Sequence, residues 1–308
     1  LMIDMSNFFA DAVGEDGVRE AEVEALSPRL DDLRPRLERW YRAEEPSFFH
    51  LPFESEHVET VYEWGQEITA GFRQLLVLGM GGSSLGGEML VNCLGGSEEF
   101  SDVLFIDNVD PVRIEETLEG IEWSDTMVLA ISKSGNTAET LAQLLTLLPQ
   151  MERAIGARAV KDHLVVITED ESGGLAEVAH RLKAPIVPHP PVGGRYSVLS
   201  AVGLLPAYVA GVDVEGVVDG AASMAERCLN SDMRDNPAFW GGAAQYALAE
   251  KGKNQTILMP YFERLNKVGS WFRQLWAESL GKLDGDGRHR GLTPARAIGA
   301  TDQHSQLQ

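Results

Sequence analysis

The sequence is short of cysteine, of positive charge and of long apolar runs, and each shortage excludes a class of protein. Its two cysteines, Cys93 and Cys228, lie in apolar stretches that are typical of helices, and neither has a partner at metal-ligand spacing. We therefore expect neither a disulfide framework nor a zinc site. We predict that both cysteines are reduced core residues, which favours a reducing compartment and a cytoplasmic protein.

Basic residues are scarce, because 26 Lys and Arg stand against 47 Asp and Glu, for a formal net charge of −21. A surface this acidic argues against nucleic acid or an anionic membrane as the main partner. A small anionic ligand is still possible, since a local pocket of amides and one or two cations outweighs a distant field.

No apolar run reaches the roughly 20 residues that a membrane-spanning helix needs. The opening segment, LMIDMSNFFADAVGEDG, lacks the basic start and the cleavage site of a signal peptide. There is no low-complexity segment, and we expect flexibility only in LDGDGRHRG (283–291). A length of 308 residues suits two domains of roughly 150 residues each.

Short runs that are apolar throughout alternate with helical patterns in the middle of the chain. Such runs are typical of parallel strands covered by helices on both faces. We expect strands near 75, 103, 126 and 163, and helices at 111–119, 137–153 and 174–182.

Helical patterns also flank this region: one begins at Ser27, one covers 57–70 and one covers 197–210. We interpret IVPHPPVGG (186–194), which precedes the last of these, as an irregular connection. The pattern then restarts with helices at 215–229 and 237–251, a strand at 254–260 and a helix over 265–282. We predict an N-terminal helical segment (1–70), a first α/β domain (71–211) and a further α/β domain (212–308). We expect this last domain to be incomplete at its C-terminus, because one strand does not make a sheet.

The first candidate binding motif is GMGGSSLGG (Gly79–Gly87), between a predicted strand and a helix. Glycines allow close backbone approach, and a helix N-terminus offers free N–H groups to an anion. The spacing is not G-x-G-x-x-G and there is no G-K-[ST], so a nucleotide site is not indicated. A plain tight turn would also explain the glycines.

The second motif is SKSGNTAET (Ser132–Thr140), which also follows a strand and opens a helix. Ser132, Ser134 and Thr137 supply short donors, and Lys133 adds a positive charge. This composition suits a phosphate site without a metal, although a helix-capping cluster would have a similar composition. Two such loops at the carboxyl ends of strands in one parallel sheet favour the ligand site.

Three later motifs, together with these two, carry a resemblance to a known family. GGRYSVLSAVGLLPAYVAG (193–211), QLWAESLGK (274–282) and ATDQHSQLQ (300–308) follow in order. Over roughly 75–308 the chain resembles the glucose-6-phosphate isomerases in their shorter bacterial form. The resemblance implies two SIS-type (flavodoxin-like) parallel-sheet α/β-sandwich domains with N-terminal helices. It also implies a phosphosugar substrate, neither metal nor nucleotide cofactor, and a homodimer.

The residue types in the later motifs suggest catalytic or binding roles, and each also has an ordinary structural explanation. Arg195 follows two glycines and can stabilise an oxyanion, unless it is a surface arginine. Gln274 and Glu278 share one helix face. Apolar neighbours suggest that Glu278 is partly buried, which would raise the pKa of its carboxyl and suit a base. A surface Glu278 paired with Lys282 is the alternative.

The resemblance assigns the roles more closely. Glu278 is implied to move a proton between C1 and C2, Gln274 to hold the substrate and Arg195 to stabilise the intermediate. His304 is implied to assist ring opening in the neighbouring subunit's site. The loop of Ser132, Lys133, Ser134 and Thr137 is implied to bind the phosphate, with Gly82 and Ser83 lining the same cleft.

Some features depart from the family. Met80 and Gly87 replace residues that are usual in the first motif, and the phosphate loop reads SKSGNT. The family's C-terminal part, with a catalytic lysine and a further substrate-contacting glutamine, has no counterpart here. If that part is truly absent, we expect very low activity, and an intact mass measurement would decide it.

Three other functions remain open. One is a bifunctional phosphoglucose/phosphomannose isomerase, which an assay with mannose 6-phosphate would reveal. Another is a non-catalytic phosphosugar sensor, which would need the 132–137 loop but not Glu278. The third is a dehydrogenase that uses the 79–87 glycines, which binding of NAD would reveal.

Overall fold

The computed structural model describes residues 3–43, 45, 47–96 and 102–306 of the chain. Two compact units are formed, one from residues 1–53, 217–257 and 276–295, the other from 54–216, 258–275 and 296–308. Each unit thus draws on several stretches of the chain, so these units differ from the consecutive domains expected from the sequence, which stay a prediction. Within the described ranges, no helix is both long enough and apolar enough to cross a membrane.

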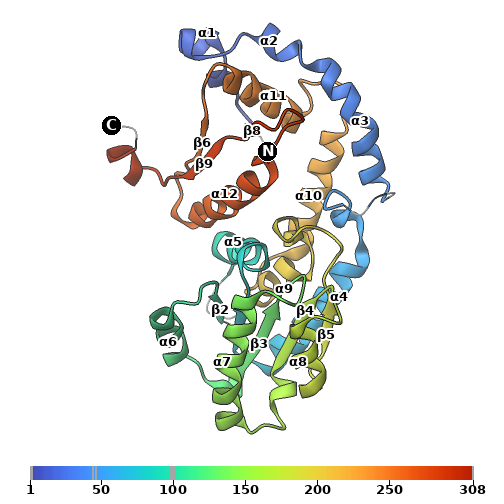
Figure 1. Ribbon diagram of the computed structural model, residues 1–308, viewed down its shortest axis with the longest axis vertical. Coiled ribbons are helices and arrows are strands. Elements are labelled where there is room, and N and C mark those ends of the chain that lie inside the picture. The colour runs from blue at the N-terminus through green and yellow to red at the C-terminus, as the bar shows by residue number, and fades with distance from the viewer. Residues whose placement is uncertain (1–2, 44, 46, 97–101, 307–308) are drawn as a thin grey trace. The chain divides into compact units, whose positions relative to one another are not determined.

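The larger unit is built on a five-stranded sheet in which all the neighbouring strands are parallel (Figure 1). The strand order is β2-β1-β3-β4-β5, the order of flavodoxin-like sheets. The predicted parallel α/β architecture is therefore confirmed. The strands are β1 (Gln74–Leu78), β2 (Asp102–Ile106), β3 (Thr126–Ile131), β4 (Leu164–Thr168) and β5 (Ile186–Pro188).

The interpretation of 186–194 as irregular throughout was wrong at its start, because Ile186 and Val187 pair with β4. Two β-branched residues suffice for a short edge strand, and an edge position tolerates the proline that follows them.

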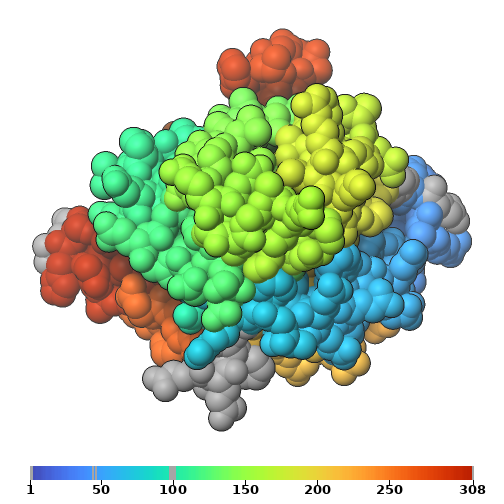
Figure 2. Space-filling model, turned by 90° about the horizontal axis from the view of Figure 1, so that it is seen from below, coloured from blue at the N-terminus to red at the C-terminus, as the bar shows by residue number. Residues whose placement is uncertain are grey.

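Alternation of side chains along the strands divides the core between two faces of the sheet. Leu76, Val128 and Leu164 lie in register on adjacent strands and belong to one buried cluster. Residues of α6 (Pro111–Glu119), α7 (Ala138–Ile155) and α8 (Gly174–Leu182) complete this cluster. Helix α9 (Ala201–Val209) packs on β1 and β2 and is covered by α4 (Ser55–Gly71). Figure 2 shows green and yellow segments that follow β3 beside the blue of α4.

The smaller unit is mainly helical. Its buried cluster includes Phe9, Val18, Leu30 and Trp240. Its helices include α2 (Glu20–Glu24), α3 (Ser27–Tyr41) and α11 (Pro237–Glu250), and α10 (Val214–Cys228) enters it.

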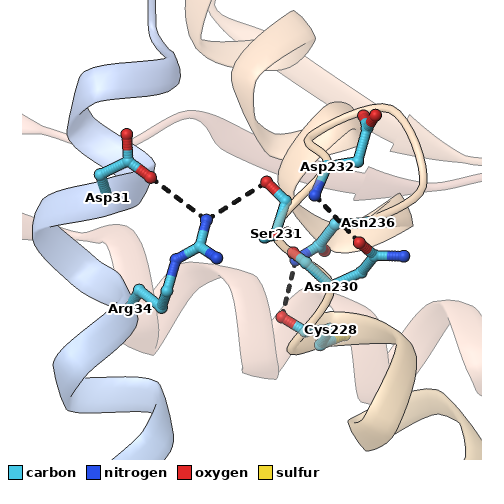
Figure 3. A network of polar contacts seen from close by, with 7 residues as sticks. All are labelled: Asp31, Arg34, Cys228, Asn230, Ser231, Asp232 and Asn236. Atoms are coloured by element: carbon cyan, nitrogen blue, oxygen red, sulfur yellow. Dashed lines mark hydrogen bonds and ion pairs between the residues drawn. The ribbon is translucent and has the colours of Figure 1, made fainter.

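Polar contacts to the turn before α11 hold this unit's segments together (Figure 3). Arg34 donates to Asp31 and to the Ser231 carbonyl, both at 3.2 Å. The Asn236 amide donates to the Cys228 carbonyl at 2.6 Å, while its Oδ1 accepts from the Phe239 N–H at the start of α11.

The stretch 283–291, expected to be flexible, contains an antiparallel pair of short strands, β7 (Lys282–Leu283) and β8 (His289–Arg290). The Asp284 carboxylate orders the turn because it accepts the backbone N–H groups of Asp286 and Arg288 and forms an ion pair with Arg290. These contacts hold the pKa of Asp284 below its usual value.

The predicted helix over 265–282 is present as α12 (Asn266–Leu280), and β6 (Gln255–Leu258) pairs with β9 (Thr293–Arg296). Backbone N–H groups of Thr293 and Ala297 donate to the carbonyls of Asn254 and Leu258, so β6 and β9 run in the same direction. This described sheet has two strands, and the second SIS domain stays a prediction. Cys93 and Cys228 are free thiols but only half-buried, and burial raises the pKa of each. The remaining short helix is α1 (Ala10–Val13).

Candidate functional site

The glycine-rich loop follows β1 and leads through a 3₁₀ turn (Gly81–Ser83) into α5 (Leu85–Leu94). Gly81 has a φ of +56°, a conformation that glycine adopts without strain. A Cβ on Gly82 would stand 2.2 Å from the carbonyl carbon of Gly194 and 2.5 Å from the amide nitrogen of Arg195. Gly82 therefore permits a close approach of two protein backbones, which the sequence did not reveal.

The segment that approaches Gly82 carries Arg195. It forms a 3₁₀ helix over Gly194–Leu199 just before α9. The Arg195 guanidinium stacks 4.3 Å above the Tyr196 ring and donates to the Tyr196 hydroxyl at 3.1 Å. The contact with Gly82 thus brings the first and third sequence motifs together, with a fixed positive charge at their junction.

Helix α12 reaches the same loop from another part of the chain. A Cβ on Gly81 would lie 2.7 Å from Gln274 Nε2, so the Gln274 amide covers this glycine. Three of the predicted site residues, Gly82, Arg195 and Gln274, therefore converge on Gly81 and Gly82. Because β1 and β3 flank the point where the strand order reverses, this loop lies where open α/β sheets bind ligands.

The second motif leaves β3 at the neighbouring position. Ser132 is buried, and its Oγ lies 2.8 Å from Thr137 Oγ1. Gly135 turns with a φ of +66°, and Thr137 stands directly before α7. These hydroxyls and the free N–H groups of an 18-residue helix form an arrangement that can accept a phosphate.

Neighbouring segments hold the second loop in place. The Lys133 carbonyl accepts from Thr168 Oγ1 at 3.2 Å, and the Lys133 ammonium pairs with Glu169 at the same distance. Ser134 is exposed and accepts the Asn136 N–H through its Oγ. The ion pair means that Lys133 approaches an anion with part of its charge already compensated.

The structure buries the predicted Ser83 in the 3₁₀ turn and places two other predicted residues, Glu278 and His304, on the surface. Glu278 is exposed one turn after Gln274 on α12, so the expectation of partial burial was wrong. The apolar residues directly before it, Trp276 and Ala277, point in other directions, because successive helix residues are rotated by about 100°. His304 ends a short 3₁₀ helix (Thr301–His304) and is exposed as well.

Two buried polar residues near the loops were not singled out from the sequence. Gln143 of α7 donates to the Asn108 carbonyl at 3.1 Å and contacts the Met80 sulfur at 3.6 Å, so it joins α7 to the glycine-rich loop. His189, directly after β5, bonds the Pro190 carbonyl through Nδ1. Burial lowers its pKa, an effect to which Lys133 adds. A polar residue on the apolar face of a helix was the available signal for Gln143.

Comparisons with known proteins found relatives that match nearly the whole chain. The sequence model of the family described as "Phosphoglucose isomerase" matches residues 54–302. A glucose-6-phosphate isomerase of Carboxydothermus hydrogenoformans is 35% identical over 100% of this chain and 69% of that protein. One from Rubrobacter xylanophilus is 39% identical over 96% of this chain and 68% of that protein.

Among solved structures, a hypothetical protein from Thermus thermophilus is similar, with a TM-score of 0.84 at 33% identity. The match covers 94% of this chain and 68% of that one.

Proposed function

The chain belongs to the phosphoglucose isomerase family, and on this premise we propose that Glu278, Arg195 and His304 interconvert glucose 6-phosphate and fructose 6-phosphate. The loop of Ser132, Lys133, Ser134 and Thr137 binds the phosphate. Gly82, Ser83 and Gln274 contact the sugar. The meeting of Gly82, Arg195 and Gln274 at one turn is the observation that supports this proposal most strongly.

The reaction begins with ring opening, in which His304 assists the transfer of a proton from the O1 hydroxyl to the ring oxygen. Glu278 then removes the C2 proton, so that the C1–C2 double bond of a cis-enediol forms and negative charge develops on O1. Arg195 stabilises that charge, because its guanidinium is always protonated and directional. Glu278 returns the proton to C1, while the hydroxyl proton passes from O2 to O1, which leaves the ketone at C2.

The exposure of Glu278 affects how this base works. Exclusion of water from the site when the substrate binds would make the Glu278 carboxylate a stronger base. Positioning and electrostatics then supply most of the rate enhancement.

We further propose a cytoplasmic homodimer in which each His304 serves the neighbouring subunit's site. The exposure of His304 on the last short helix supports a role outside its own subunit. Two free, half-buried thiols support a reducing compartment.

A coupled assay tests the function directly. We expect conversion of glucose 6-phosphate and no conversion of mannose 6-phosphate above background. Equal rates with both sugars would favour the bifunctional enzyme. Binding of glucose 6-phosphate that survives in Glu278→Gln, without turnover in either protein, would favour the sensor.

A further inference from the structure

Helices α5 and α12 are joined by an ion pair inside the larger unit. The Lys267 ammonium contacts Glu88 Oε1. The Glu88 side chain is only 12% exposed, and its other oxygen, Oε2, is buried with no hydrogen-bond partner in the described ranges of the chain. A buried carboxylate is costly unless it is paired, so this contact is strongly favoured over alternatives in which the helices shift.

A second group of contacts joins the end of α5 to the turn that precedes α12. Arg264 donates through Nε to the Asn92 carbonyl at 3.3 Å and through Nη2 to the Gly95 carbonyl. The Cys93 thiol donates back to the Arg264 carbonyl at 3.1 Å. These bonds satisfy carbonyls at the C-terminus of α5, which a helix leaves without partners.

The Glu88–Lys267 ion pair and the Gly81–Gln274 contact join the same two segments, which run in opposite directions. Gly81 meets Gln274, and Glu88, seven residues later, meets Lys267, seven residues earlier. Seven residues are two helical turns, so Lys267 and Gln274 lie on one face of α12, about 10.5 Å apart along its axis. A slip of one turn, about 5.4 Å, would break both contacts at once.

We propose that Lys267 and Glu88 are positioning residues that set the register of α12 on α5 and thereby hold the Gln274 amide against the glycine-rich loop. The assignment rests on the proposed function, in which Gln274 contacts the sugar. It concerns the sugar end of the ligand alone, because the Ser132–Thr137 loop is held by contacts to Thr168 and Glu169 that do not involve α12.

Calorimetric binding of glucose 6-phosphate and of inorganic phosphate to the chain separates the two ends of the ligand. For Lys267→Met we expect an affinity for glucose 6-phosphate lower by on the order of tenfold, with phosphate affinity unchanged. Glu88→Gln should act in the same way, Lys267→Arg should restore sugar-phosphate binding, and Gln274→Ala should reproduce the defect. Lys161→Met removes an exposed lysine whose partner is Asp162 and serves as the matched control.

Each outcome bears on the assignment. Unchanged glucose 6-phosphate affinity in folded Lys267→Met would overturn it, as would equal loss of both ligands. Should Lys267→Met fail to fold, Glu88→Gln decides by the same two affinities. If the unmodified chain binds phosphate but no glucose 6-phosphate, the proposed function fails, and the positioning role fails with it.

Discussion

Replacing Gly82 by alanine is the change for which the structure gives the most definite expectation. The new Cβ would stand 2.2 Å from the carbonyl carbon of Gly194, whereas ordinary van der Waals contact begins at 3.4 Å. The two backbones must therefore separate by about 1.2 Å at this point. Because both neighbours are main-chain atoms, no side chain can rotate away to relieve the contact.

The separation should cost both stability and binding. Overpacking of this kind costs about 1–3 kcal/mol, and each kcal/mol lowers Tm by roughly 2–4 °C in a domain of this size. Arg195 follows Gly194, so a shift of this size displaces its guanidinium. A misplacement of about 1 Å can lower kcat/KM on the order of a hundredfold.

Thermal unfolding and a coupled isomerase assay measure the two effects, and Gly87→Ala is the matched control. A Cβ on Gly87 meets its nearest atoms at 3.5 Å, within ordinary contact, so Tm should stay within error or rise. Equal behaviour of the two variants would refute the reasoning, because it would mean that the loop and the Gly194 segment do not touch as described.

Two further changes test other parts of the account. Ser132→Ala removes the hydroxyl that lies 2.8 Å from Thr137 Oγ1, and calorimetry should show phosphate affinity lower by roughly fivefold, the value of about one hydrogen bond; unchanged affinity would mean that phosphate binds elsewhere. Burial lowers the pKa of His189 from its ordinary value of 6.5, so the native state binds fewer protons than the unfolded state. The free energy of unfolding therefore falls as the pH drops below 6.5. Between pH 7.5 and 5, Tm should therefore fall less in His189→Gln than in the unmodified chain, with exposed His180→Gln as control; an unaltered slope in His189→Gln would contradict this.

Local patterns in the sequence were enough to predict most elements of the larger unit. Apolar runs placed β1 and β3 within a few residues, because a strand that is buried on both faces of the sheet is apolar throughout. Helical periodicity placed α7 and α12 equally well. The edge strand β5 was missed, since a three-residue strand that ends in proline has no such signature.

Contacts between distant segments could not be predicted in the same way. The approach of Gly82 to Gly194 joins residues more than a hundred positions apart, and nothing near Gly82 reveals the partner. The burial of Glu278 was misjudged because adjacent residues of a helix face different directions, so apolar neighbours in sequence do not surround it. The glycines of 283–291 suggested a flexible stretch, but the Asp284 carboxylate holds its turn by accepting two backbone N–H groups.

Proton exchange during isomerisation tests the central claim most directly. Glucose 6-phosphate is incubated with the chain in D₂O, and deuterium at C1 of fructose 6-phosphate and at C2 of the remaining substrate is followed by NMR. We predict deuterium at these carbons with the unmodified chain and a rate lower by about 10²–10⁴-fold with Glu278→Gln, while binding persists. Deuterium incorporation by Glu278→Gln at the unmodified rate would contradict the assignment of this carboxylate as the base.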